Sequence, residues 1–201
     1  MKKHYFSAAV AFLAALTVSA SPATEEAAKF VVEKNLPNLV KNGSFEKVGK
    51  DGRAVNWTFW KSDKSNGKVE FEKDTGFKDT GAVFTSGSSS LFTSVKVNPG
   101  EKVYVRIKTC KSGQGTASLS LRFQNAERQW LPFTVRKKIV FPKDGEWTTA
   151  EIVVKAPAKA ARVIPMIGVS GLDNLDSRIV FDEIELYNIP SAPEEKKQTT
   201  H

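Results

Sequence analysis

Histidine and cysteine are almost missing from this chain of 201 residues, which has two histidines and one cysteine. The histidines, His4 and His201, stand near its two ends. No Ser-His-Asp or Cys-His catalytic arrangement and no histidine-ligated zinc or iron site can therefore form in the domain. Cys110 has no partner for an internal disulfide. A P-loop and a Gly-x-Gly-x-x-Gly element are also absent. The fold must be held by its core or by a metal ion.

Long apolar runs are equally scarce. The only one, residues 5–18, follows Lys2 and Lys3 and leads into the small residues Ser19 and Ala20. A basic start, a short apolar stretch and small residues before a cleavage point are typical of a secretory signal peptide. The run is shorter than the ~20 residues that a membrane span needs, although a retained anchor is the alternative interpretation. We predict a signal peptide at residues 1–20, no membrane span in the mature chain, and a secreted or periplasmic protein.

The formal net charge is +8, and the lysines and arginines are scattered rather than packed into a block. A moderately basic surface favours an anionic partner such as an acidic polysaccharide. An exported chain rarely meets nucleic acid, and no nucleic-acid-binding motif occurs in the sequence. We therefore expect no nucleic-acid partner.

Two consecutive runs alternate apolar and polar residues with the period of a β-strand, at residues 103–108 and 117–124. Each should place one face in a core and one toward solvent or ligand. Many short strands with no helical pattern between them favour an all-β fold, an antiparallel β-sandwich. One domain over residues 38–189 would follow a leader at 21–37, with at most one short helical turn, and precede a disordered tail at 190–201. Further strands are predicted at residues 38–46, 69–71, 82–85, 90–97, 138–141, 148–155, 162–169 and 179–186.

Several short motifs recur in an order that resembles one known family. They are NLVKNGSFE at 38–46, Trp57, VNPG at 97–100, Trp147 before a strand that ends in Ala156-Pro157, and IVFDEIEL at 179–186. The layout resembles carbohydrate-binding modules of the family 4, 9, 16 and 22 type, which share the galactose-binding-like β-jelly-roll. The resemblance implies a jelly-roll with a non-catalytic sugar-binding role.

Carboxylates stand in the first and last of these segments, Glu46 and Asp182. Calcium prefers six to eight hard oxygen ligands, including carboxylates. We expect these two segments to lie side by side in one β-domain, so that both side chains could face one ion, and we predict a structural calcium there. The resemblance implies a further oxygen ligand from the loop that contains Asp79. The alternative is that these carboxylates are solvated or salt-bridged.

Sugar recognition needs flat aromatic faces and planar polar groups. Trp60 and Trp130 follow polar or exposed-looking residues and are candidate stacking platforms, whereas Trp57 and Trp147 match core positions of the family. The polar sides of the two alternating runs could together line a groove, in which arginine would grip a uronate or sulfate with two hydrogen bonds. An ordinary solvated face is the alternative. The candidate groove residues are Tyr104, Arg106, Lys108, Arg122 and Gln124, alongside Ser118 and Ser120.

We therefore expect an exported, monomeric, carbohydrate-binding protein that recognises a polysaccharide and is not an enzyme. Two alternatives remain open at this point. One is a structural or protein-interaction domain of the cell envelope with the same fold. The other is a small glycoside hydrolase, because carboxylates are plentiful although nothing selects a pair.

Overall fold

The computed structural model describes residues 21–173 and 176–190. The predicted signal peptide and residues 191–201 of the predicted tail lie outside the described residues. Within that part of the chain, no helix is long and apolar enough to cross a membrane. One helix and ten strands follow in order: α1 (Pro22–Glu33), β1 (Thr58–Trp60), β2 (Lys68–Glu72), β3 (Gly81–Phe92), β4 (Val95–Lys96), β5 (Lys102–Ser112), β6 (Thr116–Gln124), β7 (Trp130–Lys138), β8 (Trp147–Lys155), β9 (Arg162–Leu172) and β10 (Arg178–Ile189).

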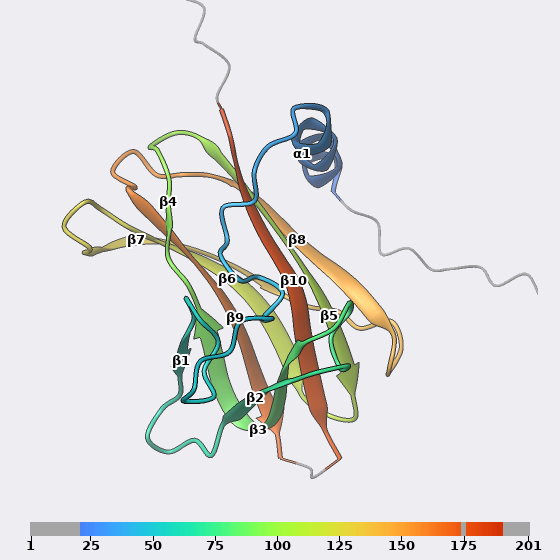
Figure 1. Cartoon of the computed structure of the whole chain (residues 1–201). Helices are drawn as coiled ribbons and strands as arrows, with labels where there is room; N and C mark the ends of the chain where they lie inside the picture. Colours follow the sequence, from blue (N-terminus) through green and yellow to red (C-terminus); the bar gives the residue numbers. More distant parts are fainter. Residues whose placement is uncertain (1–20, 174–175, 191–201) are drawn as a thin grey trace, which may run out of the picture.

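The strands form two antiparallel layers that share β3 (Figure 1). We call β7, β6, β9, β4, β1 and the second half of β3 the front sheet, and β2, β10, β5, β8 and the first half of β3 the back sheet. Residues 81–84 of β3 pair with β2 and β10, whereas residues 87–92 pair with β9 and β1. The register shifts after Gly87, whose φ of +57° suits glycine, and this is where β3 passes from one sheet to the other.

The core lies between the two sheets and is built from the apolar sides of the alternating strands. Val103, Val105 and Ile107 of β5 and Leu119 and Leu121 of β6 are all inaccessible to solvent. Phe84 and Phe181 meet edge to face, with ring centroids 5.5 Å apart. The predicted apolar faces of both runs are therefore confirmed, as is the all-β class.

The two alternating strands are not neighbours, however, which corrects the single groove predicted from them. β5 pairs with β10 and β8 in the back sheet, and β6 pairs with β7 and β9 in the front sheet. Gly113 and Gly115 have positive φ in the turn between them, which takes the chain across the sandwich. Because both strands turn their apolar sides inward, their polar sides point away from each other, onto opposite faces of the molecule.

The segment at residues 38–46 is not a strand, although its predicted position beside the last strand is confirmed. The Leu39 amide donates to the Leu186 carbonyl at 2.9 Å, and the Ile184 amide donates to the Gly43 carbonyl at 3.0 Å. Asn42 and Phe45 have φ of 56° and 58°, which breaks the extended conformation. Trp57 lies in the core as expected, with its indole nitrogen donating to the Asn42 carbonyl at 2.9 Å.

The predicted leader contains a full helix rather than a single turn. Ser21 caps α1 by accepting from the Thr24 amide, and Pro22 suits the first turn because proline has no amide hydrogen to leave unpaired. The helix packs Ala27 and Val31 on the outer face of the back sheet, next to β10 (Figure 1). It covers the buried residues Tyr104, Tyr187 and Ile189 there.

The strand predicted at residues 138–141 lies earlier, as β7. It is an edge strand with most of its side chains exposed, and Pro132 interrupts the alternation of Leu131, Phe133 and Val135, which argues against a strand in the sequence. Pro132 is tolerated because an edge strand leaves one side of its backbone unpaired.

Candidate functional site

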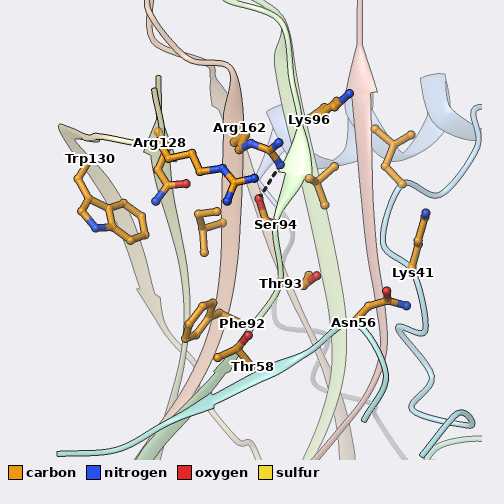
Figure 2. Close-up of a pocket in the computed structure, with 14 residues that line it drawn as sticks. Lys41, Asn56, Thr58, Phe92, Thr93, Ser94, Lys96, Arg128, Trp130 and Arg162 are labelled. Atoms are coloured by element: carbon orange, nitrogen blue, oxygen red, sulfur yellow. Dashed lines mark hydrogen bonds between the residues drawn. The ribbon is translucent and has the colours of Figure 1, made fainter. Parts of the chain in front are cut away.

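A cavity of about 840 Å³ opens on the outer face of the front sheet (Figure 2). It includes two of the predicted binding residues, Gln124 and Trp130. No aspartate or glutamate is among its lining residues, whereas four of them are lysine or arginine. Those residues are Leu39, Lys41, Asn56, Thr58, Phe92, Thr93, Ser94, Val95, Lys96, Gln124, Arg128, Trp130, Arg162 and Ile164.

Strand register shows how the rest of the front face is built beside this cavity. Thr58 of β1 faces Phe92, which faces Met166 of β9, which faces Ser120 of β6. The next row, one pleat along each strand, places small residues in its middle and runs from Trp60 through Ser90, Gly168 and Ser118 to Lys138 of β7. This row of the front face thus has small side chains between Trp60 and Lys138.

The two tryptophans of this face lie in different rows: Trp60 ends the row of small residues, whereas Trp130 pairs with Gln124, six residues along β6 from Ser118. Trp60 of β1 is 56% exposed and Trp130 of β7 is 47% exposed. The Arg122 guanidinium lies 3.9 Å from the centre of the Trp130 ring, a cation-π contact that fixes the ring while leaving much of it accessible. Of the predicted binding residues, the structure brings Trp60, Arg122, Gln124 and Trp130 onto this one face.

Charge is divided unequally between the two sheets. The strand segments of the front sheet contain no acidic residue, and their cations are Lys96, Arg122, Arg136, Lys137, Lys138 and Arg162. Every acidic strand residue lies in the back sheet: Glu70, Glu72, Glu151, Asp182, Glu183 and Glu185. The front face therefore presents positive charge without neighbouring strand carboxylates.

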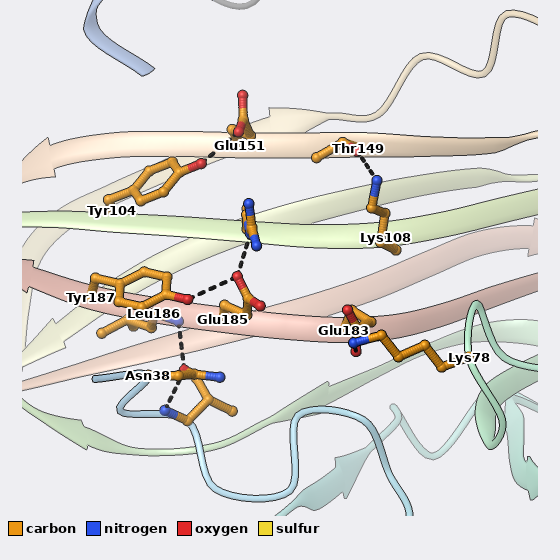
Figure 3. Close-up of polar contacts among 12 residues, drawn as sticks. Asn38, Lys78, Tyr104, Lys108, Thr149, Glu151, Glu183, Glu185, Leu186 and Tyr187 are labelled. Carbon is orange, nitrogen blue, oxygen red and sulfur yellow. Dashed lines mark hydrogen bonds and ion pairs between the residues drawn. The ribbon is translucent and has the colours of Figure 1, made fainter. Parts of the chain in front are cut away.

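The other half of the predicted groove lies on the back face, in an internally paired network (Figure 3). Tyr104 is 1% exposed and donates its hydroxyl to Glu151 at 2.6 Å. Arg106 forms an ion pair with Glu185, and Lys108 donates to the Thr149 hydroxyl at 2.9 Å. Tyr104 lies beneath α1 and cannot reach a ligand. Arg106 and Lys108 do not border the large cavity.

The acid-base properties of this network follow from its burial and its pairing. Burial and the hydrogen bond to Glu151 raise the pKa of Tyr104 well above its usual value. Burial, with the hydrogen bond to Glu185, raises the pKa of Tyr187 to about 12. The hydrogen bond to Glu185 raises the pKa of Arg106 above its ordinary value, which is already high. These groups keep their protons at neutral pH, so the network is suited to stabilising the sheet rather than to proton transfer.

The predicted metal ligands Glu46 and Asp182 meet the same loop, residues 76–80. Glu46 accepts from the Thr80 amide at 3.1 Å and from the Thr80 hydroxyl at 2.8 Å. Asp182 is inaccessible and accepts from the Lys78 amide at 3.2 Å. Burial raises its pKa, against the effect of backbone N–H groups that donate to it. Asp79 contributes its carbonyl to a turn with Gly76, and none of the described contacts joins its side chain to either carboxylate.

Four cavity cations were not predicted from the sequence: Lys41, Lys96, Arg128 and Arg162. Arg162 opens β9 opposite Gln124 of β6 and Lys96 of β4, and these pairings join residues far apart in the chain. Arg128 lies in the β6–β7 loop, where nothing in the local sequence marks a site. Only the tertiary fold brings these four residues to one cavity.

No family model matches the sequence, and no curated protein matches it either. Solved structures do match. Bacteriophage CBA120 tailspike protein 4, enzymatically active domain, has a TM-score of 0.61 at 17% identity over 76% of this chain. The CBM22-1 and GH10 modules of Clostridium thermocellum xylanase 10B, complexed with xylohexaose, have a TM-score of 0.55 at 17% identity over 75% of this chain. A family 16 carbohydrate-binding module has a TM-score of 0.53 at 14% identity over 74% of this chain.

The match spans 21% and 28% of the first two of these chains and 99% of the third. At such identities the likeness shows the fold. The chain has the β-jelly-roll fold of carbohydrate-binding modules, and the fold predicted from the sequence motifs is confirmed.

Proposed function

We propose that the protein is exported and binds a polysaccharide chain along its front face, without cleaving it. One observation carries the proposal: a cavity of about 840 Å³ on this face is lined by Trp130, which is 47% exposed, together with polar and basic side chains and no carboxylate. The jelly-roll fold, which is that of known carbohydrate-binding modules, supports it.

The residue types suit sugar rings. An indole face matches the apolar side of a pyranose, and amide and hydroxyl groups suit its hydroxyls. Trp130 offers an indole face. Gln124, Asn56 and Thr58 line the same cavity and offer amide and hydroxyl groups. The cations of the front face favour an acidic chain over a neutral one.

The side chains that surround the cavity support binding without cleavage. Most glycoside hydrolases use two carboxyl groups on either side of the scissile bond. The cavity lining contains neither Asp nor Glu, so a chain bound there would meet no such pair.

Affinity electrophoresis through a panel of neutral and acidic polysaccharides tests this function. We expect at least one polysaccharide to retard the protein, and Trp130→Ala to weaken that binding at least about tenfold, which is about 1.4 kcal/mol. Lys108→Ala, on the opposite face, is the matched control and should bind like the natural protein. If no polysaccharide retards the protein, or if both variants bind alike, the proposed site is wrong.

We also propose a structural calcium ion held by Glu46, Asp182 and the carbonyl oxygen of Thr80. A Cβ placed on Gly76 would lie 2.6 Å from that carbonyl oxygen and 2.9 Å from Asp182 Oδ2, so the two oxygens converge on one small space. Among the described residues, no three His, Cys, Asp or Glu side chains form a metal-binding group. A cation here would therefore need backbone carbonyls, which calcium accepts.

Thermal melting with and without a chelator tests the ion. If calcium is present at about 100 times its Kd, its removal costs about 2.7 kcal/mol, and the midpoint should fall by about 5–10 °C. Asp182→Asn should abolish the response to chelator, and Asp79→Asn should keep it. A natural protein that melts identically in both conditions has no structural calcium.

A further inference from the structure

Two arginines converge in the large cavity at the end of the front sheet. Arg162 donates from Nη1 to the Ser94 hydroxyl at 3.3 Å. In Figure 2 the side chain of Arg128 extends from the neighbouring loop in the direction of this pair, and all three residues line the same cavity. Lys96 adds a third cation, because it faces Arg162 across the β4–β9 pairing.

None of these three cations has a carboxylate partner in the part of the chain that the structure describes. Arg106 on the back face is the contrast, since its guanidinium is paired with Glu185. Like charges gathered in one place repel each other, and a bound anion would relieve that repulsion. The positive charge of Arg106 is thus balanced by a carboxylate, whereas the positive charge of the cavity is not.

The backbone holds Arg128 in this position. The loop is closed by a hydrogen bond from the Asn125 amide to the Gln129 carbonyl at 3.0 Å and by another from the Gln129 amide to Asn125 Oδ1 at 2.8 Å. Arg128 itself has a φ of 63°, a conformation that non-glycine residues rarely adopt and that costs about 1 kcal/mol or more. The loop therefore aims the arginine into the cavity at a cost in backbone strain.

We propose that Arg128, Arg162 and Ser94 form an oxyanion subsite that binds the carboxylate or sulfate group of an acidic sugar residue. Each guanidinium can donate two parallel hydrogen bonds to such a group. Trp130 lines the same cavity, so a ring next to the acidic residue can stack on it. This inference rests on the proposed function and narrows it to glycans that carry a negatively charged group.

Matched polysaccharides test the subsite: polygalacturonate against its full methyl ester, and a sulfated galactan against its desulfated form. The natural protein should bind at least one acidic member and bind its neutral counterpart at least about tenfold more weakly. Arg128→Gln and Arg162→Gln should each weaken acidic binding by about 10–100-fold, the effect expected for lost charged hydrogen bonds. Arg128→Lys should recover only part of the affinity, because lysine cannot form the paired hydrogen bonds.

Arg136→Gln is the control, since it removes the same charge from the front sheet at a residue that does not line the cavity. It should weaken acidic binding less than about threefold. If Arg128→Gln and Arg136→Gln lose the same affinity for acidic chains, the arginines act only by general charge attraction, and the proposed subsite is wrong. Equal affinity for a charged chain and its neutral partner would overturn it as well, while leaving the proposed function intact. Failure of every polysaccharide to bind would remove the proposed function and the subsite together. Comparison of the two acidic members identifies the carboxylate or the sulfate as the preferred group.

Discussion

Replacing Gly43 by alanine is expected to destabilise the domain by about 4 kcal/mol, which is a large part of the stability of an ordinary domain. A Cβ at this position would lie closer than 3.0 Å to the carbonyl oxygen of Ile184. That oxygen belongs to the backbone of β10, at the irregularity between Asp182 and Glu185, so the backbone itself would have to move to make room. The same change would disturb the bond from the Ile184 amide to the Gly43 carbonyl.

Urea unfolding measures the effect, and Gly52→Ala is the matched control. Gly52 lies in the loop that follows the same segment, and a Cβ there would meet nothing within 4 Å. Its φ of +75° makes alanine mildly unfavourable, by about 1 kcal/mol. If Gly43→Ala costs no more than Gly52→Ala, the close contact between the first segment and β10 is wrong.

The second large effect is expected from Val31→Asp in α1. Val31 is 8% exposed and packs with Ala27 on Tyr104 and Tyr187. Burying an unpaired carboxylate costs several kcal/mol, so the helix should detach rather than keep the charge buried. The free energy of unfolding should fall by about 2–3 kcal/mol, the value of the lost apolar contacts. Val32→Asp is the control, because Val32 is 76% exposed.

Alkaline titration of the tyrosines offers an independent measurement of helix detachment. In the natural protein Tyr187 ionises at a pKa of about 12, above its ordinary value of 10.0. Its contribution to stability is therefore complete below about pH 10 and is lost as the pH rises toward 12. Detachment of α1 should move the tyrosine titration back toward the ordinary value in Val31→Asp and leave it unchanged in Val32→Asp. Polysaccharide binding should survive in both variants, since α1 covers the face opposite the cavity. A Val31→Asp protein with unshifted tyrosines would contradict the packing of the helix.

The candidate site was only partly predictable from the sequence. Gln124 and Trp130 were predicted and do line the cavity, because a polar position on an alternating strand and a tryptophan after a polar loop are local signals. Tyr104, Arg106 and Lys108 have the same local pattern, yet they belong to the other sheet. The burial of Tyr104 was also not predictable. It is buried by α1, and the sequence predicts no more than a single helical turn in that segment.

The amino-acid sequence by itself determined the class of the fold and the inward sides of β5 and β6. These depend on the two-residue period of strands and on the burial of apolar side chains, which act locally. Only the tertiary structure decided which strands share a face, and it thereby separated Arg106 from Arg122 and joined Arg128 to Arg162. Strand partners are chosen by long-range hydrogen bonding and packing, which no local pattern of residues records.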